Sequence, residues 1–329
     1  MLEELPETLD ETYERTLREI NKTNREHAHR LLQCLAVAIR PLRIAELAQV
    51  LTIDFEAASS GETSKLKTYW RWEDQEQAVL STCSSLIAVV DEEDGFQVVQ
   101  FSHFSVKEFL TSPRLATSSA DVSRFHILPE PAHMILAKAC LGTLLRLDAR
   151  SSWSNVGDQF PLARYAAEYW VKHAQFNDVL TSIREEMEII FDPDKPYFPA
   201  WIRVYDIDVK PTIVTSTLWY FAPNEKSDAS PLYYAALCGF HHSAGYLIDK
   251  CPQQVNAIGG FYVSPLAAAL VMGHFKVAQL LYQHGADVDV QGHRKRTLMY
   301  AASCTESLEI VQWLLRHGSD PNPLDSKDN

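Results

Sequence analysis

Apolar and polar positions recur with a period of about 33 residues through the last hundred residues of the chain. The stretch Ser-Pro-Leu at 230–232 returns at 264–266, and it returns in altered form as Thr-Leu-Met at 297–299. A second apolar group follows at a similar offset in each repeat, and its members are Tyr246, Leu247, Ile248, Val277, Leu280, Leu281, Ile310, Trp313 and Leu314. This spacing predicts two short helices in each repeat.

The residues at the ends of these helices fit that prediction. Serine or threonine can cap the first helix, and proline fits its first turn. Gly239 and Gly273 permit the left-handed backbone that ends the helix, while Glu306 stands at the third position. Small residues that allow close helix packing recur as Ala235, Ala269 and Ala302. This order of motifs resembles the ankyrin repeat, which implies a solenoid of about three units starting near 230, 264 and 297.

In the first third of the chain, helical periodicity changes to alternation. Apolar positions at helical spacing predict helices over residues 7–22, 28–37, 44–51 and 75–83. The first of these follows a capping-box pattern that starts at Thr8. Residues 86–90 and 96–101 then alternate around an acidic turn, which predicts a β-hairpin. Helices followed by a hairpin are the order of a winged helix.

The charge of this region argues against nucleic-acid binding. The helix in the recognition position carries Glu73, Asp74 and Glu76 without a lysine or arginine, and residues 91–94 of the hairpin turn are all acidic. Both elements would be repelled by phosphates, and the whole chain has a formal charge of −13. We therefore expect no nucleic-acid partner.

The middle third is predicted to be helical, over residues 132–147, 162–175, 179–191 and 198–205. Residues 206–226, which contain two prolines, are expected to form an irregular connection to the repeats. The predicted fold class is mainly α. Four segments are expected: an N-terminal helix (1–24), a winged-helix-like domain with a small hairpin (25–115), a helical connector (116–222) and the ankyrin repeats (223–329).

A wider resemblance covers almost the whole chain. Residues 5–15, 40–47, 101–110 and 161–170, in this order before the repeats, resemble the part after the NTPase module in fungal NACHT-ankyrin proteins, which are NLR-like switch ATPases of the STAND class. The resemblance implies that 1–24 is the end of a NACHT-associated region. The sequence has no Gly-x4-Gly-Lys-Ser/Thr loop, so an NTPase module would have to be supplied in cis or in trans.

The resemblance also suggests a role for His103. In related switches, a Met-His-Asp motif at the end of the winged helix directs its histidine to the β-phosphate of ADP. His103 occupies the matching place, with Ser102 and Phe104 in the flanking positions. The alternative is that His103 caps or packs at the start of the helix that carries Val106 and Phe109. The sequence leaves both open.

Other chemistry is not indicated. Six cysteines are scattered singly through apolar stretches, which is typical of reduced thiols in a cytosolic protein. The start has no signal-peptide pattern, and no apolar run is long enough to span a membrane, so we expect a cytoplasmic location. The histidines lack metal-ligand spacing, and no catalytic motif occurs. We therefore expect a non-enzymatic protein without cofactor or metal.

The expected activity is binding of a partner protein through the ankyrin face. Aromatic and basic residues of the fingers and first helices are the candidates, because these types often dominate interfaces. They are Tyr233, Tyr234, Phe261, Tyr262, His293, Arg294 and Tyr300. Tyr234 and Tyr300 have the alternative of packing between helices. Two other functions stay open: a fragment of a nucleotide-controlled switch in immunity or incompatibility signalling, and a structural adaptor that uses the connector.

Overall fold

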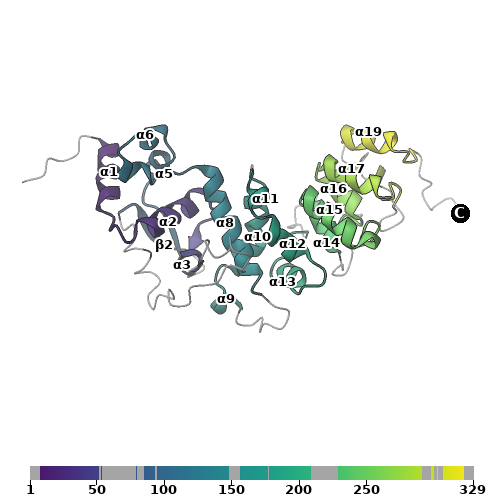
Figure 1. The fold of residues 1–329 in the computed structure, drawn as a ribbon, viewed down its shortest axis with the longest axis horizontal. Coiled ribbons are helices and arrows are strands. Elements are labelled where there is room, and N and C mark those ends of the chain that lie inside the picture. Colours follow the sequence, from purple (N-terminus) through teal and green to yellow (C-terminus); the bar gives the residue numbers. More distant parts are fainter. Residues whose placement is uncertain are drawn as a thin grey trace, which may run out of the picture. The chain divides into compact units, whose positions relative to one another are not determined.

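A computed structural model describes residues 8–51, 53, 79, 85–92, 95–147, 156–176, 178–208, 229–290, 298–299, 302 and 307–321. The chain divides into two compact units, residues 1–186 (unit 1) and 187–329 (unit 2). Figure 1 shows helices in both units and a few strands in unit 1. The predicted mainly α fold class with a small β element is confirmed.

Unit 1 begins with three helices and a small sheet. The helices are α1 (Leu9–Glu19), α2 (Arg25–Val37) and α3 (Ile44–Leu51). The predicted hairpin consists of β2 (Ile87–Asp91) and β3 (Gln97–Phe101), which pair antiparallel. A further strand, β1 (Leu42–Arg43), pairs antiparallel with the other edge of β3 and was not predicted. Most of the helix expected at 75–83 lies outside the described residues.

An ion pair fixes the start of α3 against β1. The carboxylate of Glu46 is buried, and it accepts hydrogen bonds from both terminal nitrogens of Arg40, at 2.6 and 2.8 Å. The backbone N–H of Arg43 donates to the same carboxylate at 2.8 Å. A bidentate pair with a further backbone donor compensates for the loss of hydration around a buried carboxylate. This explains why an acidic residue is tolerated on a face that packs inward.

The remainder of unit 1 is built around one long apolar helix. Its elements are α5 (Phe104–Leu110), α6 (Pro113–Ala116), α7 (Ala120–Ser123), α8 (Pro129–Leu144), α9 (Val156–Gln159), α10 (Ala163–Ala174) and α11 (Val179–Ser182). Helix α8 packs against α2 and α10. The buried Gln49 of α3 donates to Thr143 in α8 and accepts from the N–H of Leu162, which ties three helices together.

A buried histidine lies at the junction of α2, α8 and α10. His173 is fully buried, and its Nε2 shares a hydrogen bond with the Tyr165 hydroxyl at 2.9 Å. Its Nδ1 shares another with Nδ1 of His133 at 2.9 Å. The backbone N–H of Ile39, just after α2, donates to the same tyrosine hydroxyl. Burial is the main cause that lowers the pKa of His173 to about 3, and the neighbouring His133 and Lys172 lower it further.

Unit 2 contains the end of α12 (Arg184–Phe191), followed by α13 (Tyr197–Val204) and the repeats. The predicted helix over 179–191 is divided into α11 and α12, because Ile183 has a non-helical φ of −121°. The repeats consist of α14 (Pro231–Leu237), α15 (His241–Lys250), the 3-10 turn η5 (Pro252–Gln254), α16 (Pro265–Val271), α17 (Phe275–Gln283) and α19 (Leu308–Arg316).

Helices α12 and α13 form a cap on the first repeat. The rings of Phe198 and Trp201 lie 5.3 and 6.0 Å from that of Tyr234 in α14, and Phe191 lies 6.1 Å from Phe240. Lys250 at the end of α15 forms ion pairs with Asp192 and Asp194. The expected connector, 116–222, is therefore shared between the units. Residues 187–208 belong with the repeats, because Phe191, Phe198 and Trp201 contribute rings to the same core.

The local signals that predict the repeats are present in the structure. The hydroxyls of Ser230 and Ser264 accept from backbone N–H groups three residues later, each at 3.2 Å. Gly239 and Gly273 have φ values of 74° and 77°, in the left-handed region that a glycine adopts at low cost. Within unit 2, α14 packs against α16 and α15 packs against α17, so the helix pairs stack as a solenoid.

Candidate protein-binding face of the repeats

A hydrogen-bond network fixes the first inter-repeat finger, residues 256–263, to the cap. The Tyr233 hydroxyl donates to Oδ1 of the buried Asp208 at 2.9 Å, and the backbone N–H of Phe261 donates to Oδ2. The backbone N–H of Tyr262 donates to the Tyr233 oxygen at 3.0 Å. Burial is the main cause that raises the pKa of Tyr233, so the ring stays a neutral donor. The finger is therefore held by both a repeat helix and the segment after α13.

The close approach at this finger requires glycine. Gly260 has a φ of 76°, and a Cβ atom added there would lie 2.1 Å from the ring of Tyr233. The absence of a side chain lets the finger backbone lie directly against that buried ring. As a result, the positions of Ile258 and Phe261 are set by packing behind them.

Three of the expected partner-binding residues are buried. Tyr233, Tyr234 and Tyr262 have exposed fractions of 1, 2 and 4%. The hydroxyl of Tyr234 donates to Asp206, and its ring packs against the cap, as the alternative for this residue predicted. The expectation that these tyrosines face a partner is corrected, because the hydroxyls of Tyr233 and Tyr234 hold the segment after α13, and the Tyr262 hydroxyl lies against Met272.

One of the other expected partner-binding residues lies in the described part of the chain, and three do not. Phe261 is half-buried and remains a candidate. His293, Arg294 and Tyr300 lie outside the described residues. A stronger candidate is Ile258, whose side chain is 73% exposed in the same finger. An aliphatic residue directly before two glycines was the sequence signal for it. We use the name finger face for Ile258 and Phe261 together.

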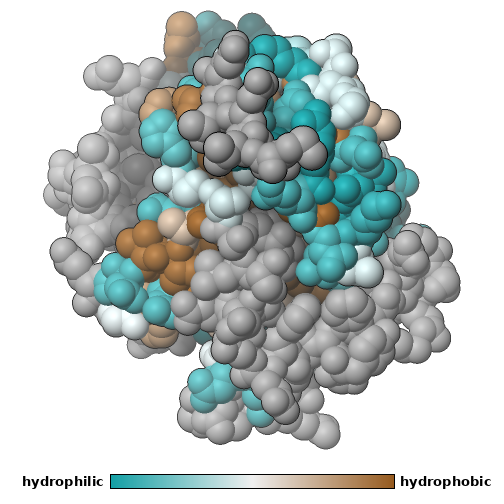
Figure 2. Space-filling view, turned by 90° about the vertical axis from the view of Figure 1, so that its left-hand side faces the viewer, coloured by the Kyte–Doolittle hydropathy of each residue, from teal (hydrophilic) through white to brown (hydrophobic). Residues whose placement is uncertain are grey.

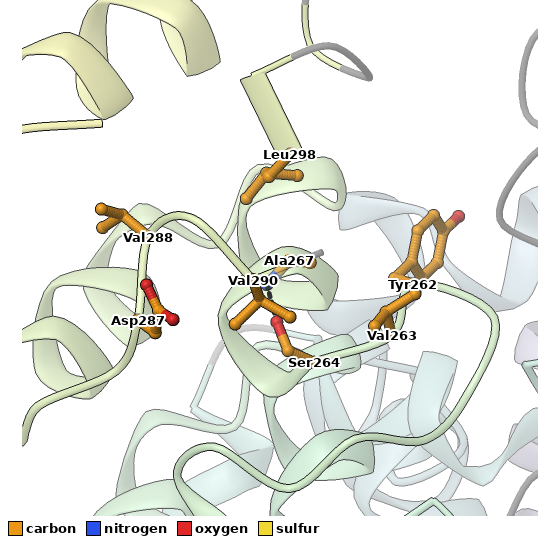
Figure 3. A pocket seen from close by; sticks show the side chains of 8 residues that line it. All are labelled: Tyr262, Val263, Ser264, Ala267, Asp287, Val288, Val290 and Leu298. Carbon is orange, nitrogen blue, oxygen red and sulfur yellow. Dashed lines mark hydrogen bonds between the residues drawn. The ribbon is translucent and has the colours of Figure 1, made fainter. Parts of the chain in front are cut away.

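A small pocket lies beside the finger, where the second repeat meets the third (Figure 3). About 250 Å³ of it is free of atoms, part of which is open solvent. The Ser264 hydroxyl at its floor is already used to cap α16. Val263 has a φ of 75°, a strained value for a β-branched residue. The residues that give the pocket its chemistry are Val263, Ala267, Val288, Val290, Leu298 and Asp287. It is thus an apolar recess with one carboxylate.

In unit 1, His103 is the N-cap of α5. Its Nδ1 accepts from the backbone N–H of Ser105 at 3.3 Å and lies 2.6 Å from the Ser105 hydroxyl. That hydroxyl also lies 2.7 Å from the Tyr13 hydroxyl in α1. The capping alternative is therefore confirmed. The ring is exposed, so this arrangement leaves its other nitrogen directed away from the cap.

The face of unit 1 that carries α1 is largely polar, with a smaller apolar area (Figure 2). Leu9 in α1 and Phe104 in α5 are 63 and 68% exposed. No helix among the described residues is long and apolar enough to cross a bilayer. In the same part of the chain, no group of three or more histidine, cysteine, aspartate or glutamate side chains is arranged to hold a metal ion.

Comparison with family models identifies two modules. Residues 232–325 match the ankyrin repeats, in three copies, and residues 13–121 match the winged helix domain of GPI inositol-deacylase. The fold and these matches define a protein in which a winged helix domain precedes ankyrin repeats. The winged-helix match reaches from α1 to α7 and so includes His103.

Similar curated proteins include one from a fungus and one from the mouse. Azaphilone pigments biosynthesis cluster protein L of Monascus ruber is 33% identical over 299 residues, which cover 87% of this chain and 61% of that protein. Ankyrin repeat and SAM domain-containing protein 6 of Mus musculus is 32% identical over 98 residues, 30% of this chain and 11% of the mouse protein. The chain thus spans about three fifths of the length of its fungal relative.

Proposed function

We propose that this chain is a non-enzymatic regulatory protein that binds a partner protein through its ankyrin repeats. The observation that carries the proposal is the finger face, where Ile258 is 73% exposed on a backbone that is fixed from behind. A binding surface that is already ordered loses little conformational entropy when a partner binds. The adjacent pocket is lined mainly by apolar side chains, and Asp287 places one carboxylate beside the finger.

The partner is expected to be lost when the finger face is changed. The variant Ile258→Ser, Phe261→Ala removes the exposed apolar contacts, and we expect at least a tenfold loss of partner capture from a lysate of the source organism. For Ile258→Ser alone the melting temperature should change little, because Ile258 is mostly in solvent. Capture by immobilised protein, quantified by mass spectrometry, measures the loss.

Leu128→Ser is the matched control, since Leu128 is an apolar residue of unit 1 with 54% exposure. It should retain capture. If Leu128→Ser loses the partner while the finger variant keeps it, the helical part of unit 1 is the binding surface and the adaptor function replaces the proposed one.

A second candidate is a nucleotide-controlled switch of the NLR-like STAND class, with immunity or incompatibility signalling as its setting. Two observations favour it: the winged-helix match and the greater length of the fungal relative. In that case an NTPase module from outside these 329 residues acts on them, and His103 is the residue proposed to sense its nucleotide. The four described cysteines are free thiols, which is typical of a reducing compartment, so a cytoplasmic location belongs to both proposals.

The chain by itself is expected not to bind nucleotide tightly. The sequence lacks the glycine-rich loop and lysine that hold the phosphates of ATP. Isothermal titration of the protein with Mg-ATP or ADP should give no heat of binding up to millimolar nucleotide. A micromolar Kd that His103→Ala weakens would instead assign a nucleotide site to the winged helix itself.

A further inference from the structure

Helix α19 has one face packed on the preceding repeat. Trp313 lies edge-on to Tyr282 of α17, with ring centroids 5.9 Å apart, and His317 shares a hydrogen bond with the Gln279 side chain at 3.1 Å. Trp313 and Leu314 are buried by this contact. These contacts fix the orientation of α19, and they therefore determine which of its residues point away from α17.

The outer face of α19 is apolar and exposed. Leu308 and Leu315 are 66 and 48% exposed, and Val311 between them is half-buried. Residues three and seven apart in a helix lie on one side, so the three side chains form a stripe along α19. In the preceding repeat, Tyr282 occupies the position of Leu315, and it contacts the rings of α19. The corresponding face of α17 in the preceding repeat therefore packs against a helix.

Charged residues beside the stripe are arranged to pair with a second copy of α19. Glu309 lies in the first turn and Arg316 in the last, seven residues apart and on the same side. If two copies of α19 lie antiparallel about a two-fold axis, Leu308 of one meets Leu315 of the other. Each Glu309 then lies near the Arg316 of the other copy. An antiparallel pairing brings the same flank of each helix together, whereas a parallel pairing brings opposite flanks together and leaves Glu309 and Arg316 without these pairs, so the charges favour the antiparallel arrangement.

We propose that the outer face of α19, formed by Leu308, Val311 and Leu315 with Glu309 and Arg316 beside them, is a self-association surface. Its occupant is α19 of a second copy of this chain, antiparallel about a two-fold axis. The contact consists of one helix from each copy, and both copies carry a net charge of −13, so the dimer is weak and depends on protein concentration. The surface is separate from the finger face, and the two are tested independently.

Sedimentation velocity of the full chain tests the association. The average mass is expected to rise from the monomer value of 37.3 kDa toward twice that value as concentration increases from the micromolar to the high micromolar range. Leu315→Asp should remain monomeric, and Leu308→Asp is a second variant with the same expectation. Leu128→Asp, at a comparably exposed leucine of unit 1, should dimerise like the parent. Circular dichroism confirms that each variant is folded.

A charge exchange tests the antiparallel geometry. Glu309→Arg gives a surface with two cations and Arg316→Glu one with two anions, so each variant alone should associate several-fold more weakly than the parent. An equimolar mixture restores both opposite-charge pairs, and it should dimerise at least as well as the parent.

Three results would overturn the proposal. The first is a parent protein that stays monomeric over the whole concentration range. The second is a dimer that Leu315→Asp and Leu308→Asp leave intact, which would place the contact elsewhere. The third is a mixture of the two charge variants that associates no better than each variant alone, which would exclude the antiparallel pairing.

Discussion

Replacing Gly260 by alanine is expected to destabilise unit 2 by about 3 kcal/mol, the larger part of it from overpacking. The backbone at this residue has a φ of 76°, and the new Cβ would lie 2.1 Å from the ring of Tyr233. That ring cannot move without breaking its hydrogen bonds to Asp208 and to the N–H of Tyr262. Urea unfolding followed by circular dichroism measures the loss.

Gly273→Ala is the matched control, because Gly273 has a φ of 77° and no heavy atom within 4 Å of the added Cβ. It should cost about 1 kcal/mol, which is the conformational part alone. A double-mutant cycle with Tyr233→Ala isolates the clash, since Gly260→Ala should cost no more than Gly273→Ala once the ring is absent. Equal losses for the two glycine variants in the parent would show that the finger does not press on Tyr233.

Acidification is expected to destabilise unit 1 through His173. Its pKa is lowered to about 3 in the folded protein, whereas an exposed histidine titrates near 6.5. The unfolded chain therefore takes up a proton below pH 6.5 and the folded chain does not. Stability that is present above pH 6.5 is lost by up to about 1.4 kcal/mol for each unit of pH between 6.5 and 3, or about 2 kcal/mol at pH 5.

His173→Gln tests the source of this loss. The amide keeps a donor and an acceptor beside Tyr165 and His133 but does not titrate. Urea unfolding at pH 7.5, 6 and 5 should show a smaller decrease in stability for the variant than for the parent. If both proteins lose stability equally with pH, other groups carry the acid sensitivity.

The repeat architecture could be predicted from sequence because its signals are local. The Ser230 cap, the Pro231 turn and the Gly239 end lie within ten residues and act on one short helix. The same holds for Thr8, whose hydroxyl accepts from the N–H of Glu11 as the capping box predicts. For such capping residues, helix geometry sets which backbone N–H group the side chain binds, so the position in the sequence is enough to predict the hydrogen bond.

The roles of the tyrosines could not be predicted in the same way. Tyr233 donates to Asp208, which lies 25 residues earlier in a segment without periodicity. Nothing local distinguishes a tyrosine that meets a buried carboxylate from one that faces a partner. Strand β1 was missed for a similar reason, since two residues carry no periodicity and their pairing with β3 is a long-range contact. The cap of α12 and α13 likewise depends on rings that meet only after folding.

That cap has a consequence for how the repeats come to be folded. A ribosome releases α12 and α13 before the first repeat, so Phe191, Phe198 and Trp201 are available when Tyr234 and Phe240 emerge. Each later repeat then packs on one side of the preceding repeat, whose other side is already covered. The solenoid is in this sense assembled from a fixed starting point, and its repeats are added in one direction away from α12 and α13.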